Sequence, residues 1–169
     1  MEATDIVKKV HELFKNGQLT LSVAESCTGG LVCHMMTDEP GASAFFKAGI
    51  VAYADDIKKG ILGVSPETID RFGVVSRETA CEMAEKVRRI SNTDYSLSTT
   101  GNLGPDVLEG KARGLVYISA GREGRTISRE LRLKGDRAAN KKEAAVSAMG
   151  LLIEIMREED QLQSPGDVQ

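Results

Sequence analysis

The sequence predicts a three-layer α/β/α sandwich with a mixed sheet, made of parallel strands plus an antiparallel hairpin. Two observations favour this fold class. In the first half of the 169 residues, apolar strand-like runs alternate with helical patterns, and around residue 122 two strand-like runs are separated only by a short turn. Alternation of strands and helices is typical of parallel sheets that are covered on both faces, whereas a short turn pairs two strands antiparallel. We expect one domain over residues 1–158 and a polar, disordered tail over residues 159–169.

The first half of the chain contains two strand–helix units that follow an N-terminal helix. Thr4 is the predicted N-cap of that helix, and apolar positions follow at helical spacing as far as Gly17. The predicted elements that come next are a strand over residues 20–25, a helix that ends near Pro40, a strand over residues 49–53 and a short helix that carries Lys58 and Lys59. We therefore expect the first two strands to lie parallel.

The second half adds two helices, a further strand, the hairpin and a last helix. Pro66 is placed to begin one helix and Gly73 to end it, and Ser76 is placed to cap the next. The remaining predicted elements are a strand over residues 95–100, a hairpin of residues 114–120 and 126–133, and a helix after Gly135. The ends of the strands at residues 25, 53 and 100 are expected to meet in one cleft, because ligands of such sheets bind beyond the carboxyl ends of the strands.

Composition excludes several classes of function. The 22 basic and 25 acidic residues leave a net charge of −3, which gives no general attraction to nucleic acid or to an anionic membrane. Only three cysteines and two histidines are present, and the usual nucleotide-phosphate and dinucleotide motifs are missing, so we expect no metal and no cofactor, although carboxylates could still hold magnesium. The acidic N-terminus and the lack of a long apolar run favour a cytoplasmic protein.

The stretch Val-Ala-Glu-Ser-Cys-Thr-Gly-Gly, residues 23–30, is the first candidate for chemistry. It places a hydroxyl, a thiol and glycines where a buried strand passes into a helix, and the N-terminus of a helix favours anions and developing negative charge. Ser26 is a candidate nucleophile, but it could equally be a helix cap. Cys27 is a competing nucleophile or a small core residue.

Three further places carry candidate site residues. Tyr53 and Lys58 are five positions apart across a strand end, although either Lys58 or Lys59 could point inward. Thr100 and Gly101 form a second strand end with a hydroxyl and a glycine, which suits a phosphate or sugar but is also common in simple turns. Arg137 stands at a predicted helix start, where a guanidinium can hold phosphate through two hydrogen bonds.

Taken together, these segments resemble the carboxy-terminal domain of the CinA family over residues 5–157. The resemblance rests on motifs in the same order and spacing, which are Ala-Glu-Ser-Cys-Thr-Gly-Gly from residue 24, Pro-Gly-Ala-Ser from residue 40, Val-Ala-Tyr from residue 51 with Lys58, Gly-Val-Val-Ser from residue 73, Thr-Gly from residue 100 with Gly-Pro from residue 104, and Gly-Asp-Arg from residue 135.

Stand-alone members of that family hydrolyse nicotinamide mononucleotide (NMN) to nicotinic acid mononucleotide and ammonia. The resemblance implies that Ser26 is the catalytic hydroxyl and that Tyr53 and Lys58 handle protons. It further implies that Thr100, Gly101 and Arg137 bind the nucleotide, with Arg137 at the phosphate. We also expect the turn residues Thr28, Gly29 and Gly30 to contact substrate. A homo-oligomer is also implied, with a dimer as the expected form.

The chain departs from the family pattern in the loop that follows Gly101. Where the family has further glycines, this loop carries Asp106 and Glu109, which would repel a phosphate if they faced the site, and Asp55 stands where asparagine is common. Two alternatives to NMN hydrolysis therefore stay open. One is a noncatalytic ligand-binding or protein-interaction module, and the other is an amidase that acts on a different nucleotide-like amide.

Overall fold

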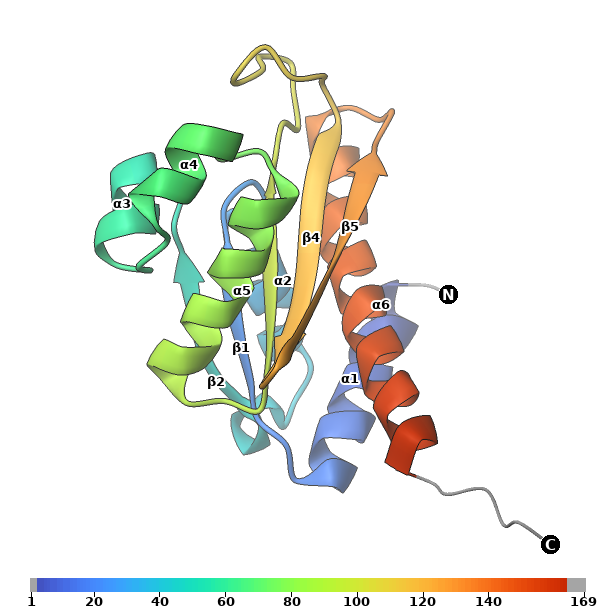
Figure 1. Ribbon diagram of the computed structural model, residues 1–169. Helices are drawn as coiled ribbons and strands as arrows, with labels where there is room; N and C mark the ends of the chain where they lie inside the picture. Colours follow the sequence, from blue (N-terminus) through green and yellow to red (C-terminus); the bar gives the residue numbers. More distant parts are fainter. Residues whose placement is uncertain (1–2, 164–169) are drawn as a thin grey trace, which may run out of the picture.

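The computed structural model describes residues 3–163, which form a five-stranded sheet between two helical layers (Figure 1). The strands are β1 (Leu21–Glu25), β2 (Phe46–Val51), β3 (Tyr95–Gly101), β4 (Leu115–Arg122) and β5 (Arg125–Arg132). Their order across the sheet is β2-β1-β3-β4-β5. Strand β1 pairs parallel with β2 and β3, whereas β3 with β4 and β4 with β5 pair antiparallel. The predicted mixed sheet is confirmed.

The helices lie on both faces of the sheet. One layer contains α1 (Ala3–Gly17), α2 (Leu31–Asp38) and α6 (Arg137–Gln163), and the other contains α3 (Asp55–Gly60), α4 (Pro66–Phe72) and α5 (Arg77–Ser91). A short 3-10 helix, Ala42–Ala44, precedes β2. Neighbouring residues of β1 show how one strand serves two cores, because Val23 packs into the cluster under α1 and α6 while Ala24 packs into the cluster under α5. Because helices cover both faces of β1, all five of its residues are buried.

Three boundaries differ from the predictions. Thr4 lies inside α1, which already includes Ala3, so it is not the N-cap. Strand β2 begins at Phe46, because its pairing with β1 starts there despite the polar Lys47 and the weak strand former Gly49. The same strand ends at Val51, so Tyr53 lies two residues beyond it.

The polar tail begins later than predicted. Helix α6 continues through Gln163, so residues 159–163 are helical and the disorder that we expected there is wrong. The reason is pairing with the hairpin, since Glu158 and Glu159 form ion pairs with Arg125, and Glu159 also pairs with Arg122. Residues 164–169 of that tail lie outside the described residues.

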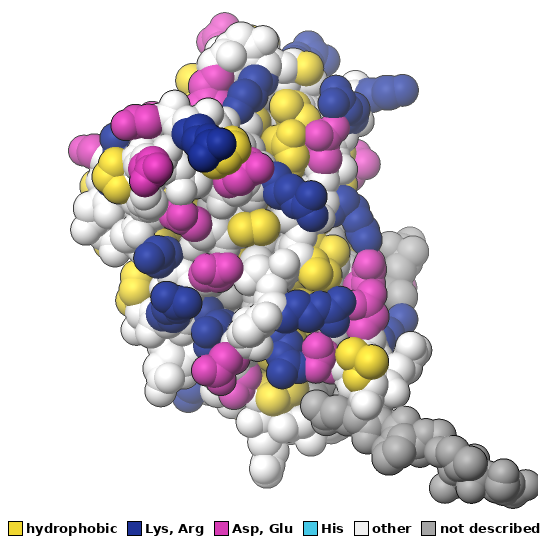
Figure 2. Space-filling model, viewed as in Figure 1, with side chains coloured by type: hydrophobic (Ala, Val, Ile, Leu, Met, Phe, Trp, Pro, Cys, Tyr) yellow, Lys and Arg dark blue, Asp and Glu magenta, His cyan; other side chains and the backbone are white. Residues whose placement is uncertain are grey.

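Charged side chains of both signs are interspersed on the face that carries α5 (Figure 2). No helix in the described part of the chain is long and apolar enough to span a membrane. The polar residues that matter most for function gather elsewhere, at the carboxyl ends of β1, β2 and β3, where the connection over residues 102–114 and the start of α6 also lie (Figure 1).

Candidate active site

A cavity of about 240 Å³ lies at the carboxyl ends of β1, β2 and β3. Five separate segments supply its lining, which consists of Ser26, Cys27, Tyr53, Asp55, Lys58, Val74, Val75, Thr100, Gly101, Asn102, Leu103, Asp106, Val107, Leu108 and Arg137. The structure thus brings together Ser26, Tyr53 and Lys58 with three of the predicted binding residues, Thr100, Gly101 and Arg137. This volume is somewhat below the range of roughly 300–1,000 Å³ that is usual for small-molecule sites.

Ser26 is held by its backbone and leaves its hydroxyl uncommitted. Its N–H donates to the carbonyl of Thr99 at 3.0 Å, and its own carbonyl accepts from the N–H of Gly29 at 3.0 Å. The side chain is mostly buried, and no residue within 3–163 forms a hydrogen bond with Oγ. Ser26 is therefore not the side-chain cap of α2, and its Oγ is available to a ligand in the cavity.

Glu25 caps α2 instead, a role that we did not predict from the sequence. Its carboxylate has no solvent exposure and accepts from the backbone N–H groups of Val32 at 2.9 Å and Cys33 at 3.0 Å, in the first turn of α2. It also accepts from the hydroxyl of Thr28 at 2.6 Å. A buried carboxylate at this end of a helix satisfies orphan donors and interacts favourably with the helix dipole. The positive end of α2 is thus occupied by the protein's own anion.

Three predicted binding residues lie outside the lining of this cavity. Thr28 is fully buried, and its hydroxyl is engaged with Glu25 and with Thr99, at 2.7 Å from the latter. Gly29 and Gly30 both have positive φ, 57° and 99°, so they shape the turn that leads into α2. The hydroxyl of Thr28 is thus committed to the structure of the turn, whereas Gly29 is exposed and Gly30 partly exposed. Contact of these three residues with substrate stays a prediction.

Cys27 lines the cavity but is poorly suited to be a nucleophile. Burial raises the pKa of its thiol to about 12, and the nearby Glu25 charge acts in the same direction. The thiolate is the reactive form of cysteine, and it is scarce near neutral pH at such a pKa. The geometry therefore favours the hydroxyl of Ser26 over the thiol of Cys27.

Lys58, rather than Lys59, is the lysine that points inward. Only 1% of its surface is exposed, and its Nζ donates to the backbone carbonyl of Tyr53 at 3.1 Å. No carboxylate in the described structure lies within ion-pair distance of Nζ. Burial lowers the pKa of Lys58, and the charge of Asp55 only partly opposes this effect. A buried amine with a lowered pKa can act as a base.

Tyr53 and Arg137 meet at the exposed edge of the cavity. Tyr53 is 58% exposed, and its hydroxyl accepts a hydrogen bond from Nη2 of Arg137 at 3.1 Å. The other arm, Nη1, donates to the carbonyl of Gly104 at 2.8 Å. Arg137 therefore links the segment after β2 to the loop after β3, and its guanidinium is placed where a phosphate could exchange for the tyrosine hydroxyl.

Thr100 and Gly101 line the cavity, but each also has a structural role. The hydroxyl of Thr100 donates to the carbonyl of Val74 at 2.6 Å. A Cβ at Gly101 would lie 2.7 Å from the backbone of Val116 and from the carbonyl oxygen of Leu115, so the close approach of β3 to β4 by itself requires glycine there. Contact with a ligand is not needed to explain either residue.

Asn102 organises the loop that closes one side of the cavity, another role that we did not predict. Its side chain donates to the carbonyls of Leu108 and Lys111, at 3.2 and 3.3 Å, and accepts from the N–H of Leu108 at 3.0 Å. Because Asn102 is 97% buried, these bonds form a protected template for the loop.

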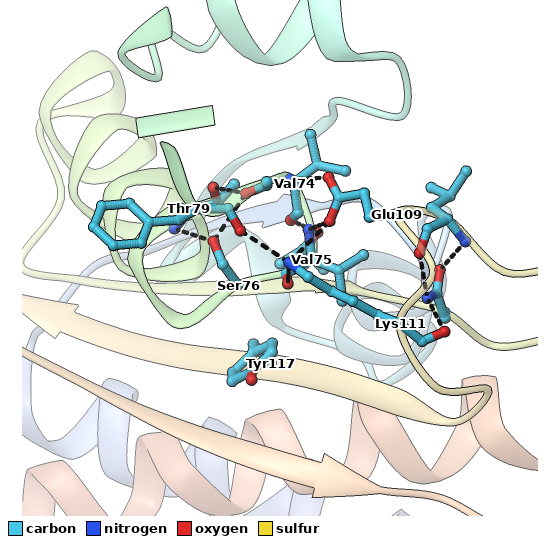
Figure 3. Close-up of polar contacts among 12 residues, drawn as sticks. Val74, Val75, Ser76, Thr79, Glu109, Lys111 and Tyr117 are labelled. Atoms are coloured by element: carbon cyan, nitrogen blue, oxygen red, sulfur yellow. Dashed lines mark hydrogen bonds and ion pairs between the residues drawn. The ribbon is translucent and has the colours of Figure 1, made fainter. Parts of the chain in front are cut away.

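Glu109 does not line the cavity but fastens the same loop to the segment before α5 (Figure 3). Its carboxylate accepts from the N–H groups of Val74 and Val75, at 2.5 and 3.2 Å, and pairs with Lys111 at 3.0 Å. Gly73 permits this contact, because a Cβ there would lie 2.4 Å from the carboxylate. The expected repulsion of a phosphate by Glu109 is thus not supported, whereas Asp106 does line the cavity.

The family model described as the CinA C-terminal domain matches residues 3–156 of the chain. The chain belongs to this family. It is 38% identical over 155 residues to a provisionally named competence-damage inducible protein of Bacillus subtilis, and 48% identical over 123 residues to one of Acetivibrio thermocellus. These alignments cover 92% and 72% of the chain, but only 37% and 30% of the relatives. The chain thus spans about a third of the length of these relatives.

Solved structures of the family have the same fold. A CinA superfamily protein of Enterobacter cloacae superposes with a TM-score of 0.89 at 32% identity, covering 92% of this chain and 93% of that one. A competence/damage inducible protein of Agrobacterium tumefaciens superposes with a TM-score of 0.87 at 32% identity, covering 90% and 94%. The family model shows the family, and the solved structures show that its members share this fold.

Proposed function

We propose that this protein is a nicotinamide-nucleotide amidase that hydrolyses NMN to nicotinic acid mononucleotide and ammonia. The observation that carries the proposal is the shared cavity of Ser26 and Lys58, which joins an uncommitted hydroxyl to a buried amine that has no carboxylate partner among residues 3–163. Membership of the CinA family is a second support.

In the proposed reaction, the neutral amine of Lys58 accepts the hydroxyl proton of Ser26 while Oγ attacks the carboxamide carbon. The C–N bond then breaks, the leaving nitrogen takes up a proton and departs as ammonia, and an acyl ester on Ser26 remains. Water hydrolyses the ester, which releases the carboxylate and restores the hydroxyl. We assign proton transfer near the leaving group to Tyr53 and Lys58, and binding of the phosphate to Arg137.

The proposal is tested by incubating the purified protein with NMN and measuring ammonia and the carboxylate product. Ser26→Ala and Lys58→Met should each reduce kcat by about 10²-fold or more, a loss typical of removing a nucleophile or its base. Lys59→Met is the matched control, because Lys59 is the adjacent lysine and does not line the cavity. Absence of turnover in the wild-type protein, or full activity in Ser26→Ala, would refute the proposal.

The same experiment separates the two alternatives. An amidase for another nucleotide-like amide would release ammonia from that compound and not from NMN, whereas a noncatalytic module would release none from any amide tested. Assembly into a homo-oligomer and a cytoplasmic location remain predictions from the sequence and its resemblance to the family.

A further inference from the structure

Two carboxylates in the cavity lining are free of hydrogen bonds and ion pairs within the part of the chain that the structure describes. Asp55 is the first residue of α3, after β2, and Asp106 lies in the loop after β3, so they come from different segments of the wall. Neither forms a hydrogen bond or ion pair with any residue that the structure describes. They differ in this from Glu25 and Glu109, whose carboxylates are engaged by backbone N–H groups.

Neither cation of the cavity forms an ion pair with these carboxylates among the described residues, although the charge of Asp55 acts on Lys58 at longer range. Lys58 is buried and donates to a backbone carbonyl, and burial lowers its pKa. Arg137 donates to the carbonyl of Gly104 and to the hydroxyl of Tyr53. The cavity thus combines a guanidinium at its exposed edge with two unpaired carboxylates in its lining. An unpaired charge in a cleft favours a ligand group of the opposite sign beside it.

We propose that Asp55 and Asp106 make the cavity selective for carboxamides on a positively charged aromatic ring, and that they discriminate against a neutral ring of the same shape. The inference rests on the proposed function, because the pyridinium ring of NMN carries a positive charge beside its carboxamide. It gives Asp106 a favourable role in a site for a phosphorylated substrate: the carboxylate attracts the ring while Arg137 binds the phosphate.

Binding of two ligands that differ in ring charge tests the proposal. NMN has a cationic ring, and the 5′-phosphate of benzamide riboside has a neutral ring, because carbon replaces the ring nitrogen. Dissociation constants are measured by calorimetry in a Ser26→Ala background, so that NMN is not consumed. Asp55→Asn, Asp106→Asn and the double variant are compared with Asp56→Asn, a neighbouring acid that does not line the cavity.

We expect NMN to bind about tenfold more tightly than the neutral analogue, since exposed charge pairs are individually weak and screened by salt. Each single substitution should reduce that preference about threefold, and the double substitution should abolish it. Asp56→Asn should leave it unchanged. Because the preference is a ratio, any effect of Asp55→Asn on Lys58 that both ligands share cancels.

The outcomes separate this inference from the proposed function. Equal binding of the two ligands, or a preference that survives in the double variant, would overturn the selectivity while leaving measured NMN hydrolysis intact. Failure of the wild-type protein to hydrolyse NMN, together with failure of the Ser26→Ala protein to bind it, would overturn both.

Discussion

The turn that carries Ser26 and the connection over residues 102–114 both border the cavity, but they are held in different ways. In the turn, Glu25, Thr28 and Thr99 form a hydrogen-bonded group with no solvent exposure. In the connection, Asn102 is buried, but the ion pair of Glu109 and Lys111 is about 30% exposed. Buried networks are costly to break, whereas exposed pairs contribute little. The difference indicates a rigid wall that presents the hydroxyl and a second wall that can open locally.

The largest effect is expected from removing the centre of the rigid wall. Glu25→Ala leaves the buried N–H groups of Val32 and Cys33 without their acceptor, so it should lower the free energy of unfolding by about 3 kcal/mol. Denaturant unfolding measures this change. Asp38→Ala, at the exposed end of α2, is the control and should change stability by less than about 0.5 kcal/mol.

Glu25→Gln sharpens the same test. The amide keeps the size of the side chain but has one acceptor oxygen in place of two. It can therefore accept the hydrogen bonds of only one of the two carboxylate oxygens. We expect a loss of stability between those of wild type and Glu25→Ala. A Glu25→Ala protein as stable as the wild type would show that the wall does not depend on this carboxylate.

Asn102→Ala should have a smaller and more local effect. It removes three hydrogen bonds that organise residues 102–111, so the loop should loosen while the sheet stays folded. We expect a loss of about 1–2 kcal/mol in unfolding free energy, faster hydrogen exchange at Leu108, and a higher KM with a smaller change in kcat. Asn16→Ala, on the exposed side of α1, is the matched control.

Global unfolding of Asn102→Ala before any local opening would contradict the comparison. In that case the loop and the rigid wall would form one cooperative unit, and hydrogen exchange at Leu108 and at Val32 would accelerate together.

The contrast between the walls also explains what the sequence could and could not predict. Alternating apolar runs predicted the layers, because periodicity reports burial directly, and the convergence of strand ends placed Ser26 and Lys58 in one cleft. Arg137 was assigned to the site from its helix start and from the resemblance to the family. The role of Glu25 depends on where α2 begins in space, and the role of Asn102 depends on a loop that folds back on it. Neither contact has a local signature. A charged residue at the end of an otherwise fully buried strand was the available signal for Glu25, since a buried carboxylate requires donors.

The smallest effect is expected at the exposed pair, and it depends on pH. Partial burial favours a higher pKa for Glu109, but hydrogen bonds from Lys111, Val74 and Val75 outweigh it and hold the pKa below its usual value of 4.5. A carboxyl whose pKa is lowered by folding stabilises the folded state above its unfolded pKa, and this contribution is lost as pH falls through the folded pKa. The fastening of the loop should therefore persist at pH 5 and above and weaken only in more acidic solution.

Amide chemical shifts of Val74 and Val75, followed by NMR during acidification, should report a transition below pH 4.5. Glu109→Gln should remove that transition and reduce stability by less than about 1 kcal/mol, because the pair is partly exposed. A transition that persists in Glu109→Gln would assign it to another group, and the second wall would then be held chiefly by Asn102.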